Sequence, residues 1–196
     1  MSDAFLTGGT VRSPELMDTI KRCLEDLTLW DTRNVKTMKE MFGNAREFNG
    51  EIGTWDTRNV RDMTSMFVGA SSFDKDISTW DTGNVASMQR MFDGAVAFNR
   101  DLCWNTSNVT NMDYMFTRAT SFNGDISKWD VRKVKSAVEM FSDAKAFNQD
   151  ISGWTLSSMQ NMAAMFHSAA SFDQDVSEWA IKAPRAIKSA NMGQCL

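Results

Sequence analysis

Metal-binding and nucleophilic side chains are scarce in this sequence. Among its 196 residues there is one histidine, His167, and there are three cysteines, Cys23, Cys103 and Cys195. An odd number of cysteines without close spacing excludes a disulfide framework and a zinc knuckle, so we interpret them as small buried or incidental thiols. A zinc site or a catalytic triad built on His167 would need a second suitable side chain beside it, and the sequence places none there. We therefore predict no catalytic residue and no metal ligand.

Long apolar runs, excess positive charge and a phosphate-binding loop are also missing. No stretch approaches the roughly 18 apolar residues of a membrane span. Residues 1–5 lack the basic region and apolar stretch that begin a secretory signal. The net charge of −4 gives no general attraction to nucleic acid, and no glycine-rich loop suits a phosphate. We expect no cofactor, no nucleic-acid partner and no membrane span. An intracellular or organellar location is favoured over the cell surface, and peripheral association with a membrane complex stays open.

Tyrosine is nearly absent too, whereas other large apolar residues are abundant. One tyrosine stands against 15 Met, 13 Phe and 7 Trp, a skew that indicates one short pattern copied many times. Tryptophan gives the period, with steps of 25, 25, 24, 25, 25 and 25 residues. The tryptophans are Trp30, Trp55, Trp80, Trp104, Trp129, Trp154 and Trp179. The unit reads W-D-T-x-N-V-x-x-M-x-x-M-F-x-x-A-x-x-F-N-x-D-I-S-x, in six complete copies, and such a period indicates a stack of repeats.

Each unit is predicted to hold one helix and one strand. In residues 109–119, apolar side chains recur at i, i+3, i+6, i+7 and i+10, which suits one helical face, and Asn108 is a natural N-cap. Residues 125–129 are short and bounded by turn formers, so we expect a strand of three or four residues. The predicted fold is α/β: a right-handed, leucine-rich-repeat-like solenoid of about six repeats. Short parallel strands would line one face, with short helices on the other.

The regular methionine and phenylalanine positions are interpreted as core, and the tryptophans as a ladder whose N–H groups bond carbonyls. The missing residue before Trp104 is interpreted as a turn deletion that leaves the apolar positions in phase.

The repeats divide the chain into three parts. Residues 1–29 form an N-terminal arm with a capping helix predicted over residues 14–27, because Ser13-Pro14-Glu15 is a helix start. Residues 30–179 form the repeat stack. Residues 180–196 lose the consensus and form a basic C-terminal cap or tail.

A column of acids recurs once per repeat, beside amides at Asn99, Asn123 and Asn148. Its members are Asp76, Asp101, Asp125, Asp150 and Asp175. Catalytic carboxylates are singular, so we interpret this column as structural, accepting N–H bonds that each chain turn leaves unpaired. A cation-binding row is the alternative.

Two basic columns are the candidate interaction surface. Arg33, Arg58 and Arg132 share one repeat position, and Lys36, Arg61 and Lys135 share the position three residues later. Near predicted helix starts the macrodipole disfavours cations, so helix stability does not explain them. One interpretation is ion pairing with Asp56, Asp81 and Asp130. The other is a basic edge that binds an acidic protein partner or lipid headgroups.

The repeat resembles a known family. The segments Trp104-Asn105-Thr106-Ser107-Asn108-Val109-Thr110-Asn111-Met112-Asp113-Tyr114-Met115-Phe116 and Ala170-Ser171-Phe172-Asp173-Gln174-Asp175-Val176-Ser177 resemble BspA-like surface-protein repeats, a divergent branch of the leucine-rich repeats. The resemblance spans residues 30–179. It implies a leucine-rich-repeat-like solenoid and a role in adhesion or protein binding, and it supplies no functional residues.

Three functions from different classes follow. The first is a non-enzymatic protein–protein interaction module, including a structural or scaffolding subunit of a larger complex, with a partner that the sequence does not identify. The second is an adhesin-like extracellular or cell-surface domain. The third is a ligand- or cation-binding protein or an enzyme, which would need a concave pocket on one face.

Overall fold

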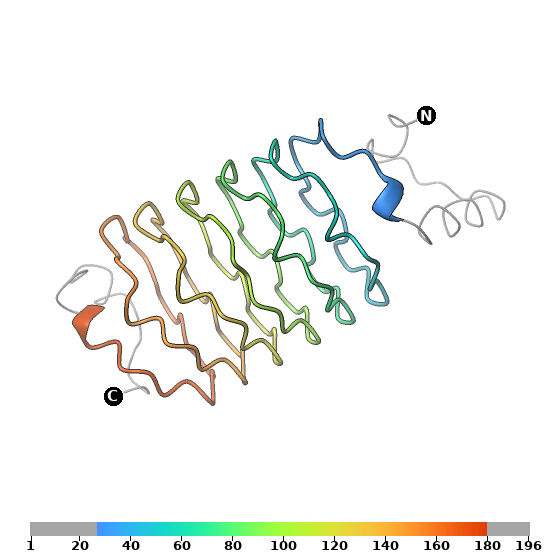
Figure 1. Cartoon of the computed structure of the whole chain (residues 1–196). Helices are drawn as coiled ribbons and strands as arrows, with labels where there is room; N and C mark the ends of the chain where they lie inside the picture. Colours follow the sequence, from blue (N-terminus) through green and yellow to red (C-terminus); the bar gives the residue numbers. More distant parts are fainter. Residues whose placement is uncertain (1–26, 180–196) are drawn as a thin grey trace.

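The computed structural model describes residues 27–179, in which every repeat forms one coil and successive coils lie side by side along one axis (Figure 1). We number the coils 1 to 6 in chain order. They comprise residues 30–54, 55–79, 80–103, 104–128, 129–153 and 154–178. The 25-residue period is therefore one full circuit of the chain. The predicted capping helix over residues 14–27 and the predicted tail at 180–196 lie outside the described residues, apart from Leu27.

The coils contain neither of the predicted elements. The 3-10 helix η1 (Leu27–Leu29) precedes coil 1, and at the other end of the described range Glu178 and Trp179 have helical backbone. Between residues 30 and 177 the structure has turns and isolated parallel bridges, with no helix and no strand. The bridges join Thr37 to Asp62, Asp62 to Ser87, Ser87 to Asn111, Asn111 to Ser136 and Ser136 to Asn161. The predicted α/β solenoid of helices and strands is therefore wrong.

Neither element forms because successive backbone N–H groups alternate between two kinds of acceptor. In coil 2, four N–H groups donate across to carbonyls of coil 3 at 2.7–3.1 Å, and the N–H groups between them close turns three residues back. The cross-coil bonds run from Met63 to Ser87, Ser65 to Gln89, Phe67 to Met91 and Gly69 to Asp93. The turn bonds run from Met66 to Met63, Val68 to Ser65 and Ala70 to Phe67. A helix would direct every N–H along its own axis, so cross-coil bonding and a helix exclude each other.

Left-handed residues make this alternation possible. Ser65 has φ of 56° and Gly69 has φ of 67°, and the same two places are left-handed in every coil. Both are third residues of turns closed by an i to i+3 bond, where a type II turn needs positive φ. The residue that donates each cross-coil bond is either one of these two left-handed residues or lies two positions from one of them. The chain thus reverses locally and still presents N–H groups to its neighbour.

Linked turns also explain why the sequence resembled a helix. Turns closed at i+3 bring Met63, Met66, Phe67, Ala70 and Phe73 to the interior, and all five are fully buried. Their spacing is the spacing of one helical face. The predicted strand at 125–129 is also a turn, in which the N–H of Trp129 donates to the carbonyl of Ile126. The parallel bridges lie instead in the segment predicted to be helical.

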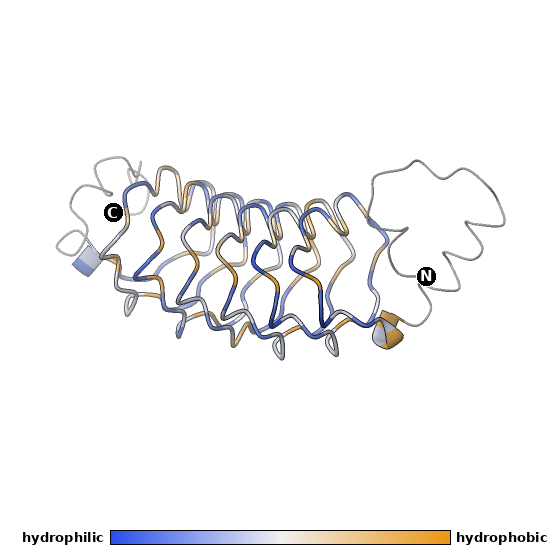
Figure 2. Cartoon of the chain, turned by 90° about the horizontal axis from the view of Figure 1, so that it is seen from above, coloured by the Kyte–Doolittle hydropathy of each residue, from blue (hydrophilic) through white to orange (hydrophobic). Residues whose placement is uncertain are grey.

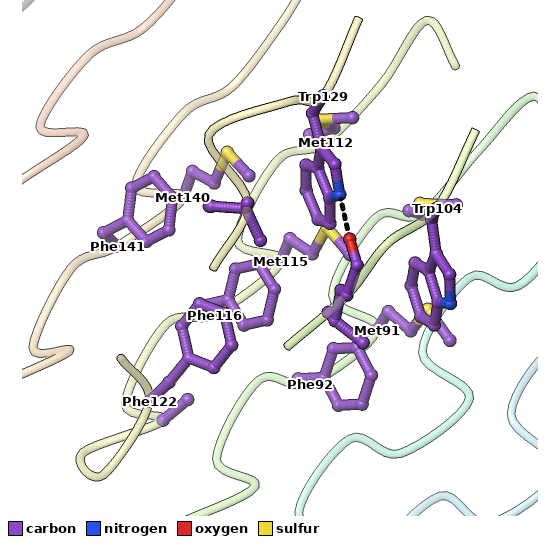
Figure 3. Packing of buried hydrophobic residues seen from close by; sticks show 14 of the residues in the cluster. Met91, Phe92, Trp104, Met112, Met115, Phe116, Phe122, Trp129, Met140 and Phe141 are labelled. Atoms are coloured by element: carbon purple, nitrogen blue, oxygen red, sulfur yellow. Dashed lines mark hydrogen bonds between the residues drawn. The ribbon is translucent and has the colours of Figure 1, made fainter. Parts of the chain in front are cut away.

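Aromatic ladders fill the interior, as the sequence predicted. Phe92, Phe116 and Phe141 stack with centroids 5.4 and 5.7 Å apart, and Trp104 and Trp129 stack at 6.3 Å (Figure 3). Each tryptophan from Trp55 to Trp154 also donates its Nε1–H to the carbonyl of a residue 27 or 28 positions earlier in the chain, at 2.7–3.3 Å. Figure 2 shows hydrophobic residues recurring at equivalent places along the stack.

The deletion before Trp104 leaves the ladders intact. Leu102 and Trp104 remain buried, and Trp104 stacks on Trp80 at 6.2 Å. Its Nε1–H still reaches the carbonyl of Ile77. The residue is lost from the turn and the apolar positions stay in phase, which confirms the prediction.

Replacing an interior tryptophan should be far more costly than replacing the first one. Trp129→Ala removes a ring that is 4% exposed together with the Nε1–H bond to Leu102, and should destabilise the stack by about 3–5 kcal/mol. Trp30 is 40% exposed, so Trp30→Ala should cost much less. Urea denaturation of both variants checks this, and equal losses would contradict the ladder as a source of stability.

A glycine substitution distinguishes the turns from a helix by the sign of its effect. Gly94 has φ of 74°, so Gly94→Ala should destabilise by about 1–2 kcal/mol, whereas in a helix the same change would stabilise by about 1 kcal/mol. Steric contact is not the cause, because the added Cβ would lie 3.6 Å from its nearest neighbour. Gly153→Ala, at an open position without positive φ, is the control and should be close to neutral. Thermal unfolding gives the readout.

Candidate interaction surface

The acid column lies at turns of the coil surface. The Oδ1 atoms of Asp76, Asp125, Asp150 and Asp175 each accept the N–H of the serine two residues later, at 2.9–3.0 Å. Hydrogen bonds from that serine's hydroxyl and N–H lower the pKa of each of these carboxyl groups. Asp101 differs, because its Oδ1 accepts the N–H of Asp125 from the next coil. The acids therefore accept backbone N–H groups at turns, as predicted.

The amides beside this column connect the coils. Asn99 Oδ1 accepts the N–H of Asn123, and Asn123 Oδ1 accepts the N–H of Asn148, both at 2.8 Å. Asn108 likewise acts between coils: its Nδ2–H donates to the carbonyl of Gly83 at 2.7 Å. It caps no helix, so its predicted role as an N-cap is wrong.

The arginine column is largely neutralised within its own turns. Arg33 pairs with Asp31, Arg58 with Asp56 and Arg132 with Asp130, at 2.7–2.8 Å, each with the acid two residues earlier. The predicted pairings with Asp56 and Asp130 are thus present. Within residues 27–179, Asp81 forms no ion pair with an arginine. The partner of Arg33 is Asp31, which the sequence interpretation did not name. These three arginines stay 68–72% exposed, so their pairs lie at the surface.

The second basic column keeps its charge. Lys36, Arg61 and Lys135 are exposed, and none forms an ion pair with another residue in the described range 27–179. Lys36 and Arg61 lie in adjacent coils, because the N–H of Arg61 donates to the carbonyl of Lys36 at 2.9 Å. Lys135 is separated from them by Ala86 and Thr110 in the same column. The helix-dipole argument about these columns does not apply, since no helix is there.

A buried carboxylate was missed by the sequence interpretation. Asp93 is 1% exposed and pairs with Arg118 at 2.6 Å and with Arg90 at 3.3 Å. The Arg90 guanidinium also lies 4.5 Å above the ring of Tyr114. The hydrogen bond that Arg118 donates to Asp93 raises the pKa of Arg118. The signal was present in the sequence, because the other coils carry Gly, Val, Thr, Ser or His at the position of Asp93.

Two further features bear on ligands. A shallow, open hollow of about 380 Å³ lies beside the arginine column, lined by Thr54, Trp55, Asp56, Thr57, Arg58, Thr79 and Asp81. Within residues 27–179, no group of three or more His, Cys, Asp or Glu side chains is arranged to hold a metal ion. In the same residues no helix is long and apolar enough to cross a bilayer.

Comparison with protein families matches this architecture to a repeat family. A profile described as "Mycoplasma protein of unknown function, DUF285" matches residues 14–103 and again residues 102–193. The chain belongs to this family. The two adjacent matches confirm a tandem-repeat protein, and they identify no partner. Comparisons with curated proteins and with solved structures find no match.

The surface pairs predict a pH dependence that can be measured at one residue. The hydrogen bond from Arg132 lowers the pKa of Asp130 from 3.8 to about 2. Because the pKa is lower when folded, this pair stabilises the fold above about pH 4, and the contribution is lost as pH falls toward about 2. In Arg132→Gln, the Asp130 carboxyl should titrate closer to 3.8 by NMR, and stability should fall less over that range. Arg118→Gln, which affects Asp93 instead, should leave Asp130 unchanged.

Proposed function

We propose that this protein is a non-enzymatic protein-interaction module, acting as an adapter or as a structural subunit of a larger complex. The observation that carries the proposal is the exposed pair Lys36 and Arg61, which keep their charge while neighbouring arginines are paired. Lys135 extends the same column on coil 5. Two exposed cations on adjacent coils suit an acidic protein segment, because complementary charge steers association and fixes register.

The scaffold supports this proposal physically. Cross-coil backbone bonds and buried aromatics hold each coil, so an exposed side chain can change without changing its position. The described hollow is shallow and open, which suits contact with another macromolecule better than enclosure of a small molecule.

A cell-surface adhesin is the second candidate. The resemblance to BspA-like repeats favours it, and the family match agrees with a surface or interaction protein. An adhesin would act outside the cell, whereas an adapter or structural subunit suits an intracellular or organellar location. The two candidates therefore differ in where the partner is met.

The charge of the column gives a test. The tagged full chain, isolated gently from its source cells, should migrate in an assembly larger than its own 22.1 kDa. The double variant Lys36→Glu/Arg61→Glu should weaken that assembly by about tenfold or more. Lys128→Glu/Lys145→Glu makes the same change in net charge at other exposed positions and should leave it intact. Equal effects of the two variants, or migration of the unchanged chain alone, would contradict the proposal.

A further inference from the structure

Three coils share one acid–arginine arrangement, which shows how this corner of a coil holds a guanidinium. In coil 1, Arg33 donates Nε–H to Asp31 Oδ1 at 2.9 Å and Nη2–H to Asp31 Oδ2 at 2.8 Å. Arg132 makes the same two contacts with Asp130 in coil 5, at 2.9 and 2.7 Å. Arg58 donates Nε–H to Asp56 at 2.8 Å in coil 2. Both carboxylate oxygens therefore face a place that a guanidinium fits.

Coil 3 keeps the acid and lacks the arginine. Asp81 stands where Asp31, Asp56 and Asp130 stand, and Gly83 replaces the arginine two residues later. Asp81 Oδ1 accepts the N–H of Gly83 at 3.0 Å, as the other acids accept the N–H of their arginines. Among residues 27–179, Asp81 has no ion-pair partner.

Coil 4 shows what removal of the whole pair produces. There Asn105 replaces the acid and Ser107 the arginine, and the turn survives, with the Ser107 N–H donating to Asn105 Oδ1 at 3.1 Å. The turn therefore does not need a carboxylate. Asp81 keeps a carboxylate although no arginine pairs with it. The turn alone therefore does not account for the negative charge of Asp81.

An open hollow borders Asp81. It has a volume of about 380 Å³, and Asp81, Asp56 and Arg58 are among its lining residues. A second guanidinium beside Arg58 is tolerated by this surface, because Arg33 and Arg58 already occupy consecutive coils. The hydrogen bond that Arg58 donates to Asp56 raises the pKa of Arg58, and the charge of Asp81 adds to that effect. The negative charge of Asp81 thus reaches the hollow.

We propose that Asp81 binds an arginine side chain of a protein partner, in the place that Arg33, Arg58 and Arg132 fill in their own coils. The site is the Asp81 carboxylate at the edge of this hollow, in a coil where Gly83 supplies no cation two residues later. The inference deepens the proposed function, since the ligand belongs to a protein, and it names one chemical group that the partner must present. The site is separate from Lys36 and Arg61, so the same partner would carry both acidic and arginine side chains.

A small probe tests the site without knowledge of the partner. The full chain labelled with ¹⁵N is titrated with N-acetyl-arginine amide, and the amide signals of Gly83 and Asn105 should shift and saturate in the millimolar range. N-acetyl-citrulline amide, which has nearly the same shape and no charge, should produce no such shift. Failure of the arginine probe, or equal shifts from both probes, would overturn the inference.

Variants of this chain provide matched controls. Gly83→Arg supplies the guanidinium in cis and should abolish the probe-induced shifts, whereas Gly83→Ala should retain them. Gly83 lacks a left-handed backbone, so both changes suit its conformation, and the added Cβ meets side-chain atoms at 3.1 and 3.3 Å. Asp81→Asn should abolish binding. Arg58→Gly should create a second binding site at Asp56. No such site is expected if the acid at this repeat position serves only to hold the turn.

The partner's role is tested separately in the native assembly. Gly83→Arg should weaken the assembly by about tenfold, and Gly83→Ala should not. If the chain forms its assembly and Gly83→Arg leaves it unchanged, the arginine proposal fails while the interaction module stands. If no assembly forms and the probe still binds at Asp81, the proposed function fails and the guanidinium site stands as a binding site without that role.

Discussion

Each coil is held to the next by backbone N–H groups that alternate between closing a turn and crossing to the neighbouring chain. The alternation requires two left-handed residues per coil, at places occupied by Gly69 and Gly94 but also by Tyr114 and Arg118. Left-handed backbone costs a residue with a side chain roughly 1–2 kcal/mol. The bonds on both sides of each such residue, together with the buried ladders, hold it there.

The same constraint separates the inside of the molecule from its outside. Inward positions must match the coil above and the coil below, so they repeat as methionine, phenylalanine and tryptophan. Outward positions contact at most their immediate neighbours and vary from coil to coil. Asp93 marks the limit of this freedom, because it is buried at a position that is small or polar elsewhere and depends on Arg90 and Arg118. A lone carboxylate there would carry a large desolvation cost.

Charge at the surface is arranged locally. All three arginines of the first column are paired with the acid two residues back along the chain, a separation that a single turn closes. Such exposed pairs contribute little to stability, with a typical range of about 0–1 kcal/mol. Their effect is to cancel charge within the first column, where the carboxylate of Asp81 is left without an arginine. The second column, Lys36, Arg61 and Lys135, forms no ion pairs within residues 27–179.

The sequence by itself determined the repeat, its period, the buried positions, the hydrogen-bonded tryptophans and the tolerated deletion at Trp104. These follow from composition and spacing, because every coil must bury the same positions. The tertiary structure decided the backbone. Residues spaced at i, i+3 and i+4 reach the interior from linked turns as well as from a helix, and only the bonds between coils distinguish the two. Tertiary structure also decided which surface charges are paired, because the turn brings Arg33 against Asp31, a pairing that the sequence did not identify.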